Sequence, residues 1–461
     1  MLFNEFHDIL PGSGIHQVYL DASANYDSAW ATLDTVTGRA LSDLGARLDT
    51  RGGPGGAVPV VVFNALTWSR SGPVRIRLPS GDTATFMARD VPSLGARVFP
   101  VHAGASLASR LPAPTVGPTW LENAYLRVEV DTATGAITRL YDKRTRREAL
   151  AAGGRGNVFQ IFGDIPREWD AWDIGYTGEE WEVTQTSGVE RSAGPAEARL
   201  AFTRRWGNST FHEAIVLGRE TPFVDFVNDV DWHETHKLLK VAFTLGVSPD
   251  SATYEIPYGT IGRSCRPRTQ AERAKYEVAG QRWADLSDAG NGVSLLNDSK
   301  YGWDCHGNVL RLSLLRSPLW PDSLADRGRH HFRFALYPHA GDWRSARTDR
   351  LAAEYNTPLV SAAEKPHAGD LGRAVSFASV DAPGVELTWV KRAEDSDALV
   401  LRLVEWHGRP ATATVTLRSR IRTAHRSNFL EDPGDAVPAT AHTLRLALRP
   451  YEIDTVVVEV P

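Results

Sequence analysis

The stretch LRVEVDTATGAITRLYD, residues 126–142, decides the fold class. Apolar and charged residues alternate in its first half, and Thr134-Gly135 separates that half from a second β-type run, which is the pattern of two strands joined by a turn. Strand-like runs recur along the chain and are followed by few helical patterns, which predicts a mainly β protein made of sandwiches rather than a doubly wound sheet. The further predicted strands are 58–64, 74–78, 224–232, 240–245, 292–298, 309–316, 331–338, 398–406, 413–417 and 454–460.

Upstream of these strands, residues 15–50 have a helical pattern. Apolar residues recur there at steps of three and four, first strongly and then more weakly, until the helix-disfavouring run RGGPGG at 51–56. Val18, Ala22, Ala29 and Leu33 form one stripe that we expect to be exposed, and exposed apolar area favours self-association. The periodic residues are Ile15, Val18, Tyr19, Ala22, Tyr26, Ala29, Trp30, Leu33, Val36, Leu41, Leu44 and Leu48.

Breaks in composition predict three domains. The Gly/Pro run at 51–56 ends the helical segment, and the segment 361–375, with Pro366, Gly369 and Gly372, precedes the last group of strands. We therefore expect a helical segment at 1–56, a large β-sandwich region at 57–365 and a small C-terminal β-sandwich at 366–461.

Composition excludes several classes of protein. The net charge of −5 over 461 residues does not favour binding to nucleic acid or to an anionic membrane. The sequence has no run of about 18 apolar residues that could form a membrane span, and its first residues do not resemble a signal peptide. Two cysteines, Cys265 and Cys305, cannot form a disulfide framework and fit a reducing compartment. We expect a cytoplasmic protein.

Two loops carry residues suited to carbohydrate. GDIPREWDAWDIG at 163–175 interleaves Trp169 and Trp172 with Asp170 and Asp173, and indole faces stack on sugar rings while carboxylates accept hydrogen bonds from hydroxyl groups. The alternative is a loop anchored by buried tryptophan. LLNDSKYGWD at 295–304 places Asp298, Lys300 and Tyr301 at a strand end, where a plain turn is the alternative reading.

The N-terminal FHDILPGS contains His7 and Asp8, a possible metal ligand and a neighbouring carboxylate. A zinc site needs about three protein ligands, so this pair alone cannot form one, and a packing or capping role is the alternative. DWHETHK at 231–237 lacks the spacing of a zinc-protease motif, because its histidines are three apart in strand-like sequence. The chain has no GxSxG motif and no Gly-rich phosphate loop.

Taken together, these segments resemble glycoside hydrolase family 38, the zinc-dependent retaining α-mannosidases, in its bacterial and cytosolic branch. The resemblance is spread in order over most of the chain and is weakest at 342–461. The resembling segments are NEFHDILPGSGIHQVY at 4–19, LENAYLRVEVDTATGAITRLYDK at 121–143, GNVFQIFGDIPREWDAWDI at 156–174, YEIPYG at 254–259, KYEVAGQRWADLSDAGNGVSLLNDSKYG at 275–302 and LRSPLWPDSLADRGRHHFRFALYPH at 315–339.

The resemblance implies a role for each candidate residue. His7 would be a zinc ligand, and Asp8 would contact the sugar at the metal. The WDAWD and NDSKYG segments would approach the mouth of the active site, which makes Trp169, Asp170, Trp172, Asp173, Asp298, Lys300 and Tyr301 candidate substrate-binding residues. Gly14 stands where this branch usually has a second serine after LPGS.

The resemblance also implies what this chain lacks. In the family, an N-terminal barrel supplies the nucleophile, the acid/base and the other zinc ligands, followed by a three-helix bundle and β-sandwiches. Retaining hydrolysis needs two carboxylates about 5–5.5 Å apart. Because no segment here resembles the barrel, we expect the C-terminal portion of an α-mannosidase, inactive alone and binding zinc fully only in the complete enzyme.

On the same resemblance, residues 1–56 would be a bundle remnant, residues 57–365 would form a sandwich like that of galactose mutarotase, and a chain containing the barrel would be a partner. An α-mannoside would be the carbohydrate bound. The alternative is a non-catalytic β-sandwich protein that binds carbohydrate or serves in assembly.

Overall fold

The computed structural model describes residues 1–105, 107 and 109–461. Its contacts divide the chain into two compact units, each assembled from separate segments. The first unit contains Met1–Arg39, Arg110–Tyr254 and Gly262–Ala352, and the second contains Ala40–Ser109, Glu255–Ile261 and Ala353–Pro461. The three domains predicted at 1–56, 57–365 and 366–461 stay a prediction.

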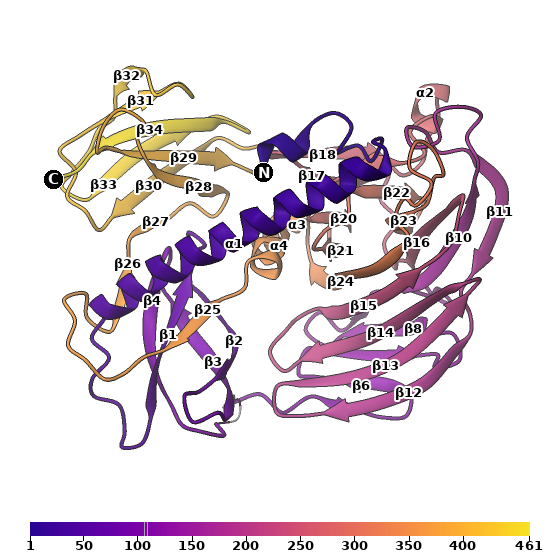
Figure 1. Ribbon diagram of the computed structural model, residues 1–461, viewed down its shortest axis with the longest axis horizontal. Helices are drawn as coiled ribbons and strands as arrows, with labels where there is room; N and C mark the ends of the chain where they lie inside the picture. Colours follow the sequence, from indigo (N-terminus) through magenta and orange to yellow (C-terminus); the bar gives the residue numbers. More distant parts are fainter. Residues whose placement is uncertain (106, 108) are drawn as a thin grey trace. The chain divides into compact units, whose positions relative to one another are not determined.

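Antiparallel sheets dominate the first unit (Figure 1). The nine-stranded sheet has the order β12 (Thr186–Ala193), β13 (Glu197–Trp206), β14 (Ser209–Gly218), β15 (Val224–Trp232), β24 (Gly328–Ala340), β21 (Asn291–Asn297), β20 (Trp283–Ser287), β17 (Ser251–Ile256) and β18 (Gly259–Ser264). The six-stranded sheet has the order β11 (Tyr176–Glu182), β10 (Val158–Asp164), β16 (Lys237–Thr244), β23 (Val309–Arg316), β22 (Gly302–His306) and β19 (Val278–Ala279). The five-stranded sheet has the order β5 (Thr115–Val116), β6 (Trp120–Glu122), β7 (Leu126–Val130), β8 (Ile137–Asp142) and β9 (Arg147–Glu148).

Side chains from all three sheets fill one apolar core. Alternation explains how single strands contribute to it: in β15, Val224, Phe226, Val230 and Trp232 are buried, whereas the residues between them are more exposed or polar. Phe226 stacks on Phe334 of the neighbouring β24, with ring centroids 5.1 Å apart. Cross-strand aromatic pairs of this kind stabilise the register between strands.

The second unit contains a smaller sheet whose central strand is buried on both faces. In β1, Val60 and Val62 pack into one apolar cluster and Val61 and Phe63 into another, so the continuous run VPVVVFN fits a strand covered on both sides. This sheet has the order β25 (Val360–Ala363), β1 (Val58–Asn64), β4 (Gly95–Val101) and β26 (Ala374–Ser376), and a separate hairpin joins β2 (Arg70–Arg77) to β3 (Thr83–Val91).

The last strands of the second unit form a β-sandwich with its own apolar core. One sheet has the order β27 (Ala378–Val380), β30 (Ala411–Leu417) and β33 (Thr443–Leu448). The other has the order β28 (Val385–Arg392), β29 (Leu399–Glu405), β34 (Ile453–Glu459), β31 (Thr423–Ser427) and β32 (Pro433–Ala436). The predicted fold class, a mainly β chain with an N-terminal helical segment and a C-terminal sandwich, is confirmed.

The helical pattern at 15–50 forms one continuous helix, α1 (His16–Arg47). The predicted exposed stripe is only partly confirmed: Leu33 is 43% exposed, but Ala22 is buried where the buried Asn4 side chain donates to its carbonyl. Trp30 and Val36 are 62% and 59% exposed instead. The other helical elements are η1 (Leu2–Glu5), α2 (Gln270–Arg273), α3 (Trp343–Ala346) and α4 (Thr348–Asn356).

No helix within the described residues combines the length and the apolar composition that crossing a membrane requires.

Candidate active-site loops

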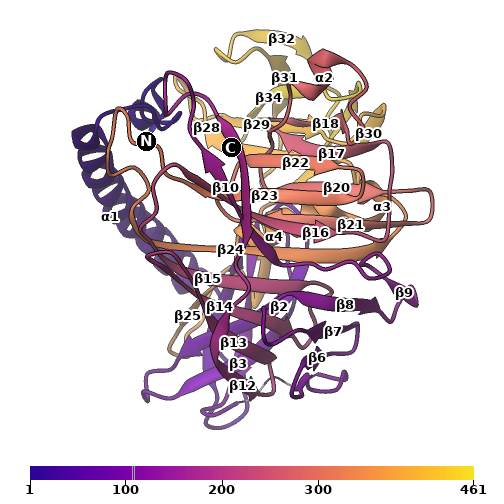
Figure 2. The same cartoon turned by 90° about the vertical axis from the view of Figure 1, so that its right-hand side faces the viewer.

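Within the first unit, the loop at residues 317–327 contacts both the WDAWD loop and α1, and Figure 2 labels the two strands that it joins, β23 and β24. Its Trp320 contacts the rings of the WDAWD loop. Its Asp322 lies against α1, where His16 Nδ1 is 3.2 Å from Asp322 Oδ2. Burial lowers the pKa of Lys300, and the negative charge of Asp326 in this loop opposes that effect. This loop therefore connects three stretches that are far apart in the sequence.

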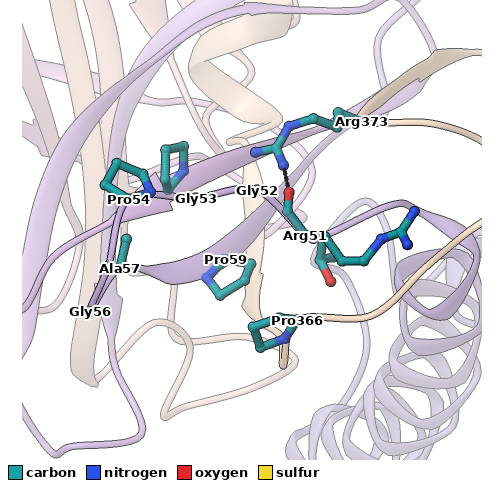
Figure 3. Close-up of a pocket in the computed structure, with 12 residues that line it drawn as sticks. Arg51, Gly52, Gly53, Pro54, Gly56, Ala57, Pro59, Pro366 and Arg373 are labelled. Atoms are coloured by element: carbon teal, nitrogen blue, oxygen red, sulfur yellow. Dashed lines mark hydrogen bonds between the residues drawn. The ribbon is translucent and has the colours of Figure 1, made fainter.

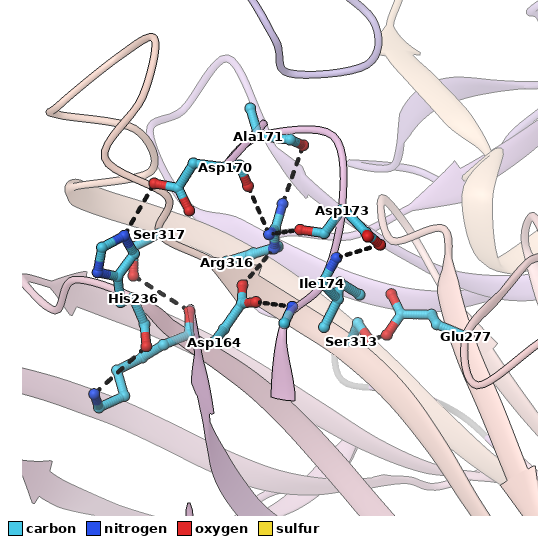
Figure 4. Close-up of polar contacts among 12 residues, drawn as sticks. Asp164, Asp170, Ala171, Asp173, Ile174, His236, Glu277, Ser313, Arg316 and Ser317 are labelled. Atoms are coloured by element: carbon cyan, nitrogen blue, oxygen red, sulfur yellow. Dashed lines mark hydrogen bonds and ion pairs between the residues drawn. The ribbon is translucent and has the colours of Figure 1, made fainter. Parts of the chain in front are cut away.

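Asp170 joins the WDAWD loop to the 317–327 loop, and Figure 4 shows its carboxylate beside the His236 ring. Its Oδ2 atom accepts hydrogen bonds from the backbone N–H groups of Leu319, at 2.6 Å, and Trp320, at 3.2 Å. His236 Nε2 lies 3.0 Å from the same oxygen. The Asp170 carboxylate therefore fixes the backbone beneath Trp320, and its role in contacting substrate stays a prediction.

Arg316 holds the WDAWD loop from below (Figure 4). Its guanidinium group donates to the carbonyl oxygens of Asp170 at 2.8 Å and Ala171 at 3.0 Å, and also to that of Asp173. Its Nε atom donates to Asp164 Oδ2 at 2.6 Å, and Asp164 is only 1% exposed. Charge-assisted hydrogen bonds to a planar guanidinium are strong and directional, so they restrict this loop to one conformation.

Three tryptophans gather at the surface of these two loops. Trp169, Trp172 and Trp320 are 61%, 50% and 51% exposed. Their ring centroids lie 5.6 to 5.9 Å apart, in tilted and edge-on arrangements. Trp169 also adopts a φ of 60°, which is unusual for a bulky residue and is found mostly where surrounding structure or function imposes it. The predicted alternative, a loop anchored by buried tryptophan, does not describe Trp169 and Trp172. We call these three side chains the tryptophan cluster.

A carboxylate and a phenol lie beside the tryptophan cluster. Asp173 is exposed, and its Oδ1 atom accepts a hydrogen bond from the Tyr276 hydroxyl at 2.8 Å. Burial and the neighbouring Asp173 carboxylate raise the pKa of Tyr276 to about 12, so this hydroxyl keeps its proton at neutral pH.

The N-terminal loop presents His7 and Asp8 to solvent. Phe6 stacks on the His7 ring, with centroids 4.9 Å apart and planes 9° apart. The loop is closed by Tyr19 of α1, whose hydroxyl donates to the Asp8 carbonyl at 3.2 Å and accepts from the Gly14 N–H at 2.7 Å. Burial raises the pKa of Tyr19, and the negative charges of Asp322, Asp326 and Asp8 add to the effect.

Whether this loop could hold zinc depends on how many ligand side chains lie around His7 and Asp8. Among the described residues, no group of three or more His, Cys, Asp and Glu side chains is placed to hold a metal ion. His7 and Asp8 are not part of such a group in the described chain, and the two-ligand limit inferred from the sequence stays a prediction.

Asp298, Lys300 and Tyr301 lie in the turn after β21. The Asn297 side chain accepts hydrogen bonds from the backbone N–H groups of Ser299 and Lys300, which is the usual chemistry of an Asx turn. The Lys300 ammonium lies 4.6 Å from the centre of the Phe332 ring, and burial lowers its pKa. Asp298 accepts from the Arg333 backbone, and Tyr301 is 61% exposed.

Sequence reasoning missed four residues that contact the predicted loops or α1: Trp320, Asp322, Arg316 and His236. Trp320 and Asp322 lie in LRSPLWPDSLADRG, where a tryptophan between prolines was the available signal. Arg316 gave none, because an arginine at a strand end is ordinary. His236 was expected in a strand but lies between β15 and β16, and its segment was considered only as a metal motif. Their partners lie 143 to 152 residues away for Arg316 and 66 residues away for His236.

A separate pocket of about 270 Å³ lies in the second unit (Figure 3). The Gly/Pro run at 52–56 lines it together with Arg373, whose guanidinium donates to the Arg51 carbonyl. The described residues that line this pocket include no carboxylate and no histidine, so they offer no acid/base or metal chemistry.

Comparison with known proteins places these loops in a family. Residues 121–324 match the glycosyl hydrolases family 38 C-terminal domain, and residues 384–456 match the glycosyl hydrolases family 38 C-terminal beta sandwich domain. The chain carries the C-terminal domains of glycosyl hydrolase family 38. Both the WDAWD loop and most of the 317–327 loop lie inside the first match.

The relatives of this family 38 chain are longer than the chain itself. Alpha-mannosidase 2C1 of Homo sapiens is 35% identical over an alignment that covers 98% of this chain and 44% of the relative. Alpha-mannosidase of Saccharomyces cerevisiae is 34% identical over 60% of this chain and 27% of its own length. This chain thus spans less than half the length of these relatives.

The fold of the family 38 chain is also found in a solved structure. The crystal structure of an alpha-mannosidase from Enterococcus faecalis V583 covers 99% of this chain with a TM-score of 0.83, while this chain covers 62% of that one. At 16% identity, this likeness supports the fold alone.

Proposed function

We propose that this chain acts as the C-terminal part of a zinc-dependent retaining α-mannosidase that hydrolyses α-mannosidic bonds in oligosaccharides. The observation that carries the proposal is the match of relatives named alpha-mannosidase over 98% of the chain. In this proposal the nucleophile and the acid/base come from a barrel region outside this chain. A cytoplasmic location is part of the proposal, supported by the two buried, unbridged cysteines.

Within that enzyme, His7 would supply one imidazole ligand to zinc, and Asp8 would hold a sugar hydroxyl. Their position supports this role, because both side chains are exposed on a loop that Tyr19 closes. Asp298, Lys300 and Tyr301 would line the approach to the site. Zinc, when bound in the complete enzyme, would polarise sugar hydroxyls near the reacting carbon.

We propose that the exposed side of α1 receives the barrel region or, without it, a second copy of the chain. Trp30, Leu33 and Val36 are all more than 40% exposed on this helix. Leu2, Phe3 and Phe6, at the N-terminus, are exposed to at least 64%. Apolar surface of this extent is typical of protein contacts.

The test compares the purified chain alone with the chain mixed or co-expressed with the barrel region of a family relative, using an aryl α-mannoside. We expect no turnover by the chain alone and turnover by the combination. In the combination, His7→Ala should lose bound zinc and activity, whereas Asp8→Asn should keep most of the zinc and lose rate, because an amide holds a hydroxyl less firmly than a carboxylate does.

The matched control is His331→Ala, which removes an exposed histidine of the same unit that pairs with Asp229 at the surface. This variant should keep zinc and turnover. Turnover by the chain alone, or full zinc and full rate in the His7→Ala combination, would show that the proposal is wrong.

A second candidate function is carbohydrate binding without catalysis. The tryptophan cluster favours it, since three exposed indoles are present in the chain itself. The chain would then bind a mannoside but stay inactive in every combination with a barrel region.

A further inference from the structure

We propose that the tryptophan cluster is a binding subsite for a neutral pyranose ring, with Trp320 as its central stacking residue and with Arg316 and Asp170 as positioning residues. The binding of a sugar ring rests on the geometry of the loops. Its assignment to mannose rests on the proposed function, and the experiments below separate the two.

The exposure of the three indoles is the first argument. Burying a tryptophan removes a large apolar area from water, so a folded chain rarely leaves three together at its surface without a ligand or partner. Trp320 lies within 5.7 Å of Trp169 and 5.6 Å of Trp172, measured between ring centroids. Indole faces attract the polarised C–H bonds of a pyranose ring, and the tilts of 59° and 38° between these rings present faces in more than one direction.

The second argument is that charged residues fix the two loops before any ligand arrives. Asp170 holds the backbone of Leu319 and Trp320, and Arg316 holds three carbonyl oxygens of the WDAWD loop. A preorganised loop loses little conformational entropy on binding, which strengthens the weak contacts that a small neutral ligand can make. A loop that merely covered the sheet would not need this number of charge-assisted bonds.

The third argument concerns the charge and polarity of the ligand. Arg316 directs its donors to Asp164 and to the loop carbonyls, so it offers no cation to a phosphate or carboxylate ligand. At the edge of the cluster, Asp173 is exposed and its carboxylate can accept hydrogen bonds from hydroxyl groups. Aromatic faces beside a hydrogen-bond acceptor suit a neutral polyol ring better than an anion.

Binding is measured on the full chain with methyl α-D-mannopyranoside and α-linked mannobiose, by calorimetry and by quenching of tryptophan fluorescence. We expect saturable binding in the range of about 1 mM or tighter. Trp320→Ala should weaken it at least about tenfold, as loss of a central aromatic anchor does. The matched control is Trp389→Ala, because Trp389 is also 51% exposed but lies in the other unit. It should bind as the unaltered chain does.

The positioning role has a spectroscopic readout. Indoles 5.6 to 5.9 Å apart couple and give a paired signal in circular dichroism. Arg316→Met should lose this signal and weaken sugar binding, although all three tryptophans remain. Arg316→Lys keeps the charge but not the planar fork, and should restore only part of both. Asp170→Asn should weaken the signal less than Asp170→Ala, since an amide oxygen can still accept from the two backbone N–H groups.

Several results would overturn the inference. No binding of either sugar up to about 50 mM would exclude a useful site. Equal binding by the Trp320→Ala variant would place the sugar elsewhere. Loss of self-association in Trp320→Ala without any sugar binding would make the cluster a protein contact. Two further results separate the subsite from the proposed function. Binding of a glucoside and a mannoside with equal affinity would support the subsite and count against its assignment to mannose. Failure of the barrel combination to hydrolyse mannosides would count against the proposed function only.

Discussion

At the scale of single residues, the first unit contains an ion pair whose two side chains are both buried. Arg204 Nη2 lies 2.8 Å from Glu213 Oε2, with the two side chains 1% and 0% exposed. Asn157 also donates to this carboxylate, and Arg204 lies 4.4 Å from the centre of the Phe159 ring. Burial raises the pKa of Glu213 and lowers the pKa of Arg204, whereas the attraction between the two charges opposes both shifts.

Removing one member of this pair should therefore be costly. Arg204→Met leaves the Glu213 carboxylate buried without its cation, and we expect the free energy of unfolding to fall by about 3–5 kcal/mol at pH 7. Because the pKa of Glu213 in the folded variant is raised, the variant regains stability at low pH. It loses that stability as the pH rises from the ordinary glutamate pKa of about 4.3 through the raised value.

Urea unfolding of the variant at a series of pH values measures this effect. The control is the double variant Arg204→Met with Glu213→Leu, which removes both charges and should recover much of the loss, with no comparable pH dependence. Equal destabilisation of the single and double variants would contradict the assignment of the cost to an unpaired buried charge.

At the scale of one element, α1 has an apolar face that is buried at its C-terminal end and exposed in its middle. Leu41 and Leu44 pack with the buried Leu48 against the cluster of β1 and β4. Trp30 and Leu33 continue this face at the helical spacing of three and four residues, yet they are 62% and 43% exposed. One apolar pattern thus has two environments, which helical periodicity alone does not distinguish.

The exposed part of this face should drive self-association. Substituting Trp30→Glu together with Leu33→Glu should lower the apparent molar mass at high concentration, because charge replaces exposed apolar surface without removing a core contact. Light scattering coupled to size-exclusion chromatography measures the mass, and far-UV circular dichroism confirms that the helix persists.

Ala31→Glu serves as the control for this experiment. Ala31 is exposed on the same helix, and the helical rotation directs it away from Leu33. This variant should associate as the unaltered chain does. An unaltered chain that stays monomeric at high concentration, or equal association of all three proteins, would refute the role of this face.

At the scale of the whole molecule, metal content tests the division of labour between this chain and a barrel region. The described residues contain no group of three potential ligands, so a zinc ion at His7 would stay mostly hydrated. After dialysis, we expect far less than one zinc per purified chain by elemental analysis. Stoichiometric zinc that survives dialysis and is lost in His7→Ala would mean that the chain completes a site by itself.

Much of the architecture follows from local patterns. Alternation predicted strands such as 224–232 and 309–316, which the structure has at the same residues, because a strand with one buried face requires a period of two. Several other strands, such as β10 and β13, were not recognised. Residues typical of sugar contact also revealed Trp169 and Trp172 without knowledge of their surroundings, because their chemistry lies in the side chains themselves.

The sequence by itself therefore determined the β class, the N-terminal helix, the family resemblance and the residue types of the candidate loops, all of which depend on neighbours within a few positions. Only the tertiary structure decided that Trp320 joins Trp169, 151 positions apart, and that Asp170 turns its carboxylate toward the backbone of the other loop. Such contacts depend on which strand ends meet when distant strands pair in a sheet. Strand pairing is governed by packing of the whole core, which no local periodicity encodes.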